Sequence, residues 1–211
     1  MDPDPLLGRR AVSLSVLLRT LTICVLLSAT ALAQAPIPLN SERIEARFGS
    51  YAIEVLEHSS ELRISNLYSI EGDTRVTRTF AVVAYPTHVD AALTSEHEAI
   101  LAGGSIGAVF AANGWRVYKH NRLIGTVQDT EKLRALMRRE HEAALALHVY
   151  SFEVERDRER HEYALIAEIH HPDYLSEREL AAIYGPVPPL TRAQRRTLER
   201  VLDAVRRAVA D

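Results

Sequence analysis

The sequence is poor in cysteine, in tryptophan and in long apolar runs. Its 211 residues include one cysteine, Cys24, and one tryptophan. A single cysteine excludes a disulfide within the chain, so stability has to come from the burial of apolar side chains. The longest uncharged, mostly apolar run covers residues 20–33. It is shorter than the stretch of about 20 residues that a helix needs to span a bilayer.

This run has the pattern of a secretory signal. Three arginines precede or flank it, and it ends in Ala31-Leu32-Ala33, the small-x-small pattern of a cleavage site. We predict a signal peptide over residues 1–33, cleaved between Ala33 and Gln34, and a periplasmic or secreted protein without a transmembrane anchor in the mature chain. Cleavage removes the cysteine. It also takes three bases and two acids from totals of 25 and 28, which leaves a net charge of −4. This acidic balance argues against nucleic-acid binding.

The periodicity of the mature chain predicts an α+β fold. Apolar residues alternate over 51–57, 62–70, 76–85, 145–155 and 161–170, as in strands, and residues 115–127 form one or two more. Helices are expected after Asp90 and Ser105, over 131–142 and 176–184, and in a C-terminal amphipathic segment, 191–211. A proline-rich linker covers 185–190. We expect one antiparallel sheet with the helices packed on one face.

An internal repeat is also indicated. Residues 66–71 resemble 148–153 at an offset of 82, and residues 80–84 resemble 163–167 at an offset of 83. Both pairs of segments predict a β-hairpin followed by a helix, over about 62–113 and 145–184, within one domain that covers 34–184. A polar groove between the two halves is then expected. Amphipathic hairpins can also look alike through patterning alone.

The segment Gly103-Gly104-Ser105-Ile106-Gly107 matches the G-x-S-x-G pattern of a serine hydrolase. Asp129 and a later histidine, one of His148, His161, His170 and His171, would complete the triad in chain order. That chemistry requires a strand before Ser105, whereas the preceding residues have helical periodicity. The alternative is a glycine break with Ser105 as the N-cap of a helix.

Histidine and glutamate near the second hairpin form a candidate metal site. Glu168 and His170 share one face of a strand, and a five-residue loop at 156–160 would place His148 opposite Glu168. These three side chains could bind zinc or copper. The register of the first hairpin, carried across by the repeat, instead pairs His148 with Tyr163 and turns Glu168 to the other face.

Two further groups are candidates for ligand binding. One follows a strand and consists of His171, Asp173 and Tyr174. The other alternates along one strand and forms a basic, aromatic stripe that would suit another envelope protein, an anionic glycan or a lipid headgroup: Arg116, Tyr118, His120 and Arg122. A capped turn and a charged edge strand are the structural alternatives.

No group has strong catalytic spacing. The sequence therefore favours a non-enzymatic periplasmic binding or accessory domain. A small serine hydrolase using Ser105 and a His/Glu metal-binding protein are the alternatives.

Overall fold

The computed structural model of the protein describes residues 38–210. The predicted signal peptide, its predicted cleavage site and Cys24 lie outside these residues. The strands are β1 (Ala52–His58), β2 (Leu62–Glu71), β3 (Thr74–Ala84), β4 (Arg116–Gln128), β5 (Ala144–Arg156) and β6 (Glu159–His170). The helices are α1 (Asn40–Phe48), a 3-10 turn (Ala91–Leu93), α2 (Thr94–Leu101), α3 (Ile106–Ala112), α4 (Glu131–Leu136), α5 (Glu177–Tyr184) and α6 (Arg192–Val209).

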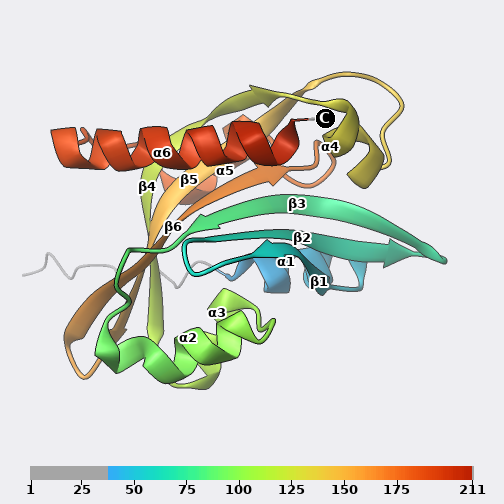
Figure 1. The fold of residues 1–211 in the computed structure, drawn as a ribbon. Coiled ribbons are helices and arrows are strands. Elements are labelled where there is room, and N and C mark those ends of the chain that lie inside the picture. The colour runs from blue at the N-terminus through green and yellow to red at the C-terminus, as the bar shows by residue number, and fades with distance from the viewer. Residues whose placement is uncertain (1–37, 211) are drawn as a thin grey trace, which may run out of the picture. The chain divides into compact units, whose positions relative to one another are not determined.

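The six strands form one antiparallel sheet in the order β1-β2-β3-β6-β5-β4 (Figure 1). It consists of two three-stranded meanders, β1–β2–β3 and β4–β5–β6, which meet where β3 pairs with β6. The α+β class and the C-terminal helix are therefore confirmed. β1 and β4 are the two edge strands.

The two meanders have β-bulges at corresponding places. In the hairpins β2–β3 and β5–β6 the pairing slips at Arg78 and at Tyr163, which are 85 positions apart. The bulges against the outer strands fall beside Ser65–Ile64 of β2 and beside Tyr150–Val149 of β5, again 85 apart. A bulge displaces one residue and so sets which side chains face each side of the sheet. Equivalent backbone positions in β2 and β5 are therefore related by 85 residues.

This offset corrects the register carried across by the sequence repeat. His148 pairs with Glu168, as the loop length predicts, and does not pair with Tyr163. The segments that look alike at offsets of 82 and 83 are similar in apolar pattern but occupy different places in the two hairpins.

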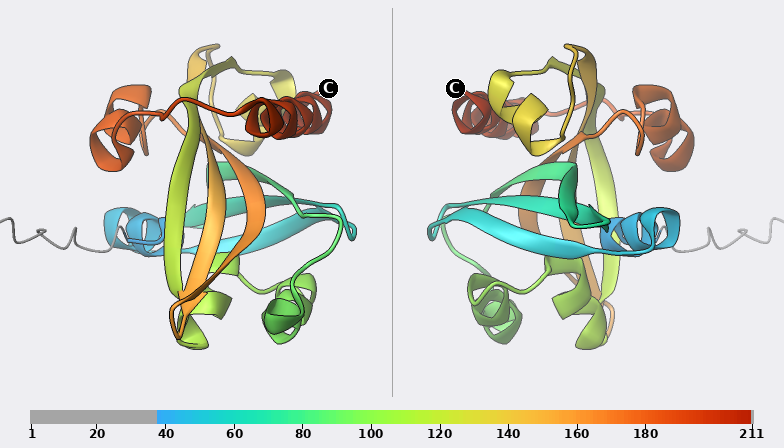
Figure 2. Two further views of the ribbon diagram at one scale, coloured as in Figure 1. Left: turned by 90° about the vertical axis from the view of Figure 1, so that its left-hand side faces the viewer. Right: turned by 90° about the vertical axis from the view of Figure 1, so that its right-hand side faces the viewer.

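The prediction that the helices pack on one face of the sheet is wrong. One face carries Phe80, Val82 and Ala167 and is covered by α4 and α6. The opposite face carries Leu67 and Ala81 under α1 and α5, and further along it packs against α2 and α3. Figure 2 shows α6 on one side of the strands and α1 and α5 on the other. The inner strands are apolar on both faces, which is the pattern of a doubly covered sheet.

Helix ends follow the local sequence. Thr191 with Gln194 and Ser176 with Glu179 form the two predicted capping boxes at the starts of α6 and α5. The helix expected over 131–142 ends earlier, at Leu136. Within residues 38–210, no helix combines the length and the apolar character needed to cross a membrane.

Candidate functional site

A small cavity lies on the face of the sheet that α1 and α3 cover. Its volume is about 60 Å³. That exceeds the space of one water, about 10–15 Å³, and the cavity is partly open to solvent, so an occupant need not lie wholly within this volume. The side chains around it are apolar (Leu39, Ile53, Leu67, Val83, Ile106, Phe152), polar (Asn40, Ser65, Ser105, Tyr150) and charged (Arg63, Lys119, Glu168). Two cations and one carboxylate leave the lining with an excess of one positive charge.

Arg63 on β2 is completely buried, with an exposed fraction of 0%. Its Nη1 donates to the carbonyl oxygens of Ile100 (3.1 Å) and Gly104 (2.8 Å), which join it to the break between α2 and α3. Its Nε and Nη2 meet no acceptor, and Arg63 forms no ion pair with any carboxylate of residues 38–210. Burial raises the pKa of Tyr85, and the nearby guanidinium of Arg63 opposes that rise. The Tyr85 hydroxyl makes no well-formed hydrogen bond to it or to any other group of residues 38–210.

Glu168 on β6 also borders the cavity. One carboxylate oxygen accepts hydrogen bonds from the Tyr150 hydroxyl (3.0 Å) and from Asn40 Nδ2 (3.3 Å). Burial alone raises the pKa of Glu168, but Lys119, the imidazoles of His170 and His148 and the Tyr150 hydroxyl together outweigh it and lower the pKa to about 2. Lys119 Nζ lies 4.5 Å from the centre of the Tyr150 ring. Glu168 is therefore a buried carboxylate that stays ionised.

The structure brings His148, Glu168 and His170 together. One ligand atom of each lies within 4.8 Å of the others. Burial lowers the pKa of His148 to about 3 and that of His170 to about 4, although the carboxylate of Glu168 acts in the opposite direction. Both imidazoles are therefore neutral at pH 7, which is the form that binds metals. Metal binding itself stays a prediction.

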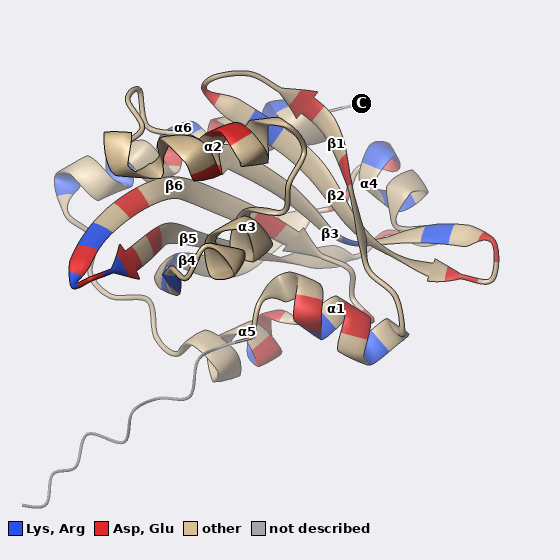
Figure 3. Ribbon diagram, turned by 90° about the horizontal axis from the view of Figure 1, so that it is seen from below, with Lys and Arg blue, Asp and Glu red and all other residues tan. Residues whose placement is uncertain are grey.

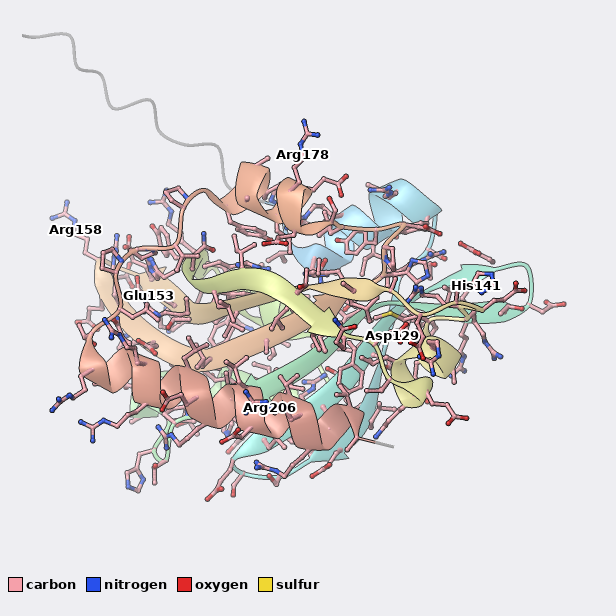
Figure 4. All side chains as sticks on the ribbon, turned by 90° about the horizontal axis from the view of Figure 1, so that it is seen from above. Asp129, His141, Glu153, Arg158, Arg178 and Arg206 are labelled. Atoms are coloured by element: carbon pink, nitrogen blue, oxygen red, sulfur yellow. The ribbon has the colours of Figure 1, made fainter. Side chains whose placement is uncertain are left out.

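Ser105 borders the cavity but does not lie at the strand-to-helix turn of a nucleophile elbow. The residues before it form α2, so the segment runs helix, glycine break, helix, and Ser105 occupies the N-cap of α3. Its hydroxyl makes no capping bond and accepts a hydrogen bond from Tyr51 (3.3 Å), its one side-chain partner within the described chain. Asp129, labelled in Figure 4, pairs instead with Arg134 and Arg139, both at 2.6 Å. The triad expected from the motif is not assembled.

His171, Asp173 and Tyr174 do not converge on a pocket. His171 Nε2 donates to the carbonyl of Met137 (3.1 Å), and Nδ1 accepts from the backbone N–H of Asp173 (3.0 Å). The Asp173 carboxylate is exposed, and the Tyr174 hydroxyl bonds Asn40 on the other side of the segment. This arrangement is a capped turn.

The residues of the stripe on β4 share one face, as expected, and they lie among acidic and polar residues of β5. His120 Nε2 lies 3.3 Å from Glu153, and Tyr118 stacks on His120 beneath Arg160. Arg122 Nε donates to Ser151 (3.0 Å), while Arg116 is exposed opposite Glu155. Figure 3 shows basic and acidic residues interspersed at the β5–β6 end of the sheet. The stripe is a charged edge strand.

Three residues of the site were missed from the sequence. Asn40 lies in α1, which was not predicted, and Glu42 at the start of that helix was the available signal because it caps the Leu39 N–H at 2.7 Å. Arg63 alternates with Leu62 and Ile64, so the pattern placed it in solvent. Asn121 lies beside the β4 bulge, whose position the sequence does not indicate.

No family model matches the chain, and no curated protein matches it in sequence. Two solved structures are distantly similar in fold. A GntR-family transcriptional regulator from Enterococcus faecalis V583 is 13% identical over 60% of this chain and 93% of that chain, with a TM-score of 0.37. The C-terminal domain of Yurk from Bacillus subtilis subsp. subtilis str. 168 is 15% identical over 59% of this chain and 89% of that chain, with a TM-score of 0.34. Likenesses this distant assign no function to the chain.

Proposed function

We propose that the protein is an exported, non-enzymatic binding protein whose partly open cavity takes a small carboxylate with a short apolar body. The observation that carries this proposal is Arg63. A buried guanidinium is normally paired with an anion, because an unpaired buried charge is strongly unfavourable. Arg63 has no such partner among residues 38–210.

The free donors of Arg63 favour a carboxylate in particular. Nε and Nη2 are the two nitrogens along one edge of the guanidinium, and their N–H bonds run parallel. That edge matches the two oxygens of a carboxylate, which it can bind with two hydrogen bonds. Nη1 is already held by the backbone of the α2–α3 break, which fixes the direction of this edge.

The rest of the cavity defines the body of the ligand. Leu67, Val83 and Phe152 surround it with apolar surface, which favours a hydrocarbon segment. Glu168 is an ionised acceptor on the strand two places away from Arg63 in the sheet. Adjacent strands are about 4.8 Å apart, so a ligand that spans three or four carbons could place a hydroxyl near this acceptor.

We also infer that the two meanders arose from one duplicated three-stranded unit. The shared bulges support this inference, since all relate β2–β3 to β5–β6 by 85 residues. Residues 63 and 148 then hold equivalent places. The cavity is lined by both units, since Arg63 and Leu67 belong to the first and Lys119, Tyr150 and Glu168 to the second.

Calorimetric titration with three small probes tests the carboxylate assignment. Butyrate carries the carboxylate, butyramide replaces it with a neutral amide of the same shape, and 4-hydroxybutyrate adds a hydroxyl for Glu168. We expect butyrate to bind and butyramide not to bind, and we expect 4-hydroxybutyrate to bind more tightly than butyrate. EDTA is present throughout, so that no metal contributes.

Two arginine variants provide the matched comparison. Arg63→Gln should weaken butyrate binding about 10-fold or more, the loss expected for charge-assisted hydrogen bonds. Arg75→Gln removes an exposed arginine of β3 and should leave the affinity unchanged. Near-ultraviolet circular dichroism verifies the fold of each variant. Equal binding of butyrate and butyramide by the wild type contradicts the proposal without reference to any variant.

A further inference from the structure

His148, Glu168 and His170 lie on neighbouring strands and face the same side of the sheet. His148 of β5 is directly opposite Glu168 of β6, and His170 follows two residues later. The three side chains are 0%, 4% and 1% exposed. His170 Nε2 lies 3.8 Å from Glu168 Oε2, and one nitrogen of each ring and one carboxylate oxygen all lie within 4.8 Å of one another. Tetrahedral zinc separates its ligand atoms by about 3.4 Å, so a contraction of up to about 1.4 Å would close the set around one ion.

The hydrogen bonds of His148 leave one ring nitrogen available. Its Nε2 lies 2.9 Å from Asn121 Oδ1. Asn121 Nδ2 donates to the carbonyls of Tyr184 (2.8 Å) and Gly185 (3.2 Å), which fixes Oδ1 as the atom that faces the ring. His148 Nε2 must therefore carry the proton. The lone pair is on Nδ1, which is buried and has no partner among residues 38–210.

His170 is held in a similar way through its other nitrogen. Nδ1 lies 3.0 Å from Thr79 Oγ1, and Thr79 Oγ1 also accepts a hydrogen bond from Asn40 Nδ2 (3.1 Å). In the tautomer whose Nδ1–H donates to Thr79, Nε2 carries the lone pair, and this nitrogen too is buried and makes no hydrogen bond within the described residues. In metal sites, a histidine usually donates a hydrogen bond from one ring nitrogen and binds the metal through the other.

We propose that His148 Nδ1, a carboxylate oxygen of Glu168 and His170 Nε2 bind a zinc ion. Two neutral imidazoles and one carboxylate form a ligand set that zinc takes in proteins, with a fourth position open to water or another ligand. The two free nitrogens favour a zinc site over a purely hydrogen-bonded polar cluster, because in such a cluster both nitrogens would have hydrogen-bond partners. The proposal does not depend on carboxylate binding at Arg63.

Two cations near the site oppose the ion. Lys119 lies against the Tyr150 and Tyr184 rings, at 4.5 and 5.7 Å from their centres, and Arg43 lies 5.3 Å from the centre of Tyr184. Both contribute positive charge at His148. Removing the charge of Lys119 should therefore tighten zinc binding, which is the opposite of what loss of a ligand does.

The test is a titration of the metal-free full mature protein with Zn²⁺, with Co²⁺ in parallel to report coordination by its visible absorption. We expect one ion per chain. His170→Gln and Glu168→Gln each remove a zinc ligand and should weaken zinc binding by at least about 100-fold. Asn121 only orients His148, so Asn121→Ala should cause a smaller loss of zinc affinity, about 10–100-fold. His97→Gln, which changes a half-buried histidine bonded to Tyr163, is the matched control and should bind as the wild type does.

Lys119→Met keeps the test decisive if a ligand variant fails to fold. Tighter zinc binding in this variant supports the proposal, and unchanged or weaker binding overturns it. Absence of zinc binding by the wild type, or full affinity in both His170→Gln and Glu168→Gln, overturns it as well. Since butyrate binding is measured in EDTA, failure of either site leaves the other testable.

Discussion

On β2 and β5, which hold corresponding places in the two meanders, the same backbone positions carry different chemistry. Arg63 corresponds to His148, Ser65 to Tyr150 and Leu67 to Phe152, each pair 85 residues apart and facing the same side. The first meander buries a permanent cation without an anion. The second buries neutral imidazoles beside a carboxylate. The comparison teaches that the bulges fix where a side chain points, while its identity decides whether the position suits an anion or a metal ion.

The opposite face of the sheet should be energetically alike in the two meanders. Phe80 and Leu165 are 85 positions apart and pack in one core with α6. Phe80→Ala should lower the free energy of unfolding by about 3–5 kcal/mol and Leu165→Ala by about 2–5 kcal/mol, through lost contacts and the cavity left behind. Urea denaturation measures both. A cost below about 1 kcal/mol for only one of them would break the correspondence.

Lowering the pH should reduce the free energy of unfolding, mainly through His148 and His170 of the second meander. Unfolded histidines take up protons below pH 6.5, whereas His148 and His170 stay neutral down to about pH 3 and 4. The unfolded state then binds more protons, so the free energy of unfolding falls as the pH is lowered from 6.5. Each histidine contributes a loss of about 2 kcal/mol between pH 6.5 and 5. Glu168, whose pKa is lowered from 4.5 to about 2, extends the loss below pH 4.5.

Chemical denaturation in EDTA at several pH values checks this slope. The double variant His148→Gln/His170→Gln should be much less sensitive between pH 6.5 and 5. Some dependence remains, because burial also lowers the pKa of His97 and His171. Arg63→Gln changes the corresponding position of the first meander and should keep the wild-type slope. An equal slope in all three proteins would show that the imidazole pair is not buried as described.

A smaller effect separates Tyr150 from its counterpart Ser65. The Tyr150 hydroxyl donates to the ionised Glu168 at 3.0 Å. Tyr150→Phe should therefore lower the free energy of unfolding by about 1.5–3 kcal/mol, the range for a hydrogen bond to a charged group. Ser65 has no side-chain hydrogen bond within residues 38–210, so Ser65→Ala should change it by less than about 0.5 kcal/mol. Similar costs at the two positions would contradict the difference drawn between the meanders.

Local rules predicted much of the fold. Alternating apolar residues gave all six strands, and the capping pairs Ser176–Glu179 and Thr191–Gln194 gave the starts of the last two helices. The side of the sheet on which each helix packs depends on contacts between distant segments, which periodicity does not encode. The strands at the middle of the sheet are apolar on both faces, and this was the overlooked indication that both faces are covered.

The candidate site was predicted only in part. His148, Glu168 and His170 could be assembled because they lie on one hairpin, whose loop length sets the register. Arg63 could not, because a charged residue that alternates with apolar ones normally faces solvent. The break between α2 and α3 lies over it, where the carbonyls of Ile100 and Gly104 hold its Nη1. Asn40 and Asn121 orient the site from a short helix and a bulge, and neither feature has a strong sequence pattern.

The central assignment is that the buried, unpaired guanidinium of Arg63 in the first meander binds an anion. A crystal structure of the protein with 4-hydroxybutyrate tests it most directly. The account predicts the two carboxylate oxygens at hydrogen-bonding distance from Nε and Nη2 of Arg63, with the chain of carbons against Leu67 and Val83. Density for the ligand elsewhere, with both nitrogens of Arg63 still without an acceptor, would contradict it.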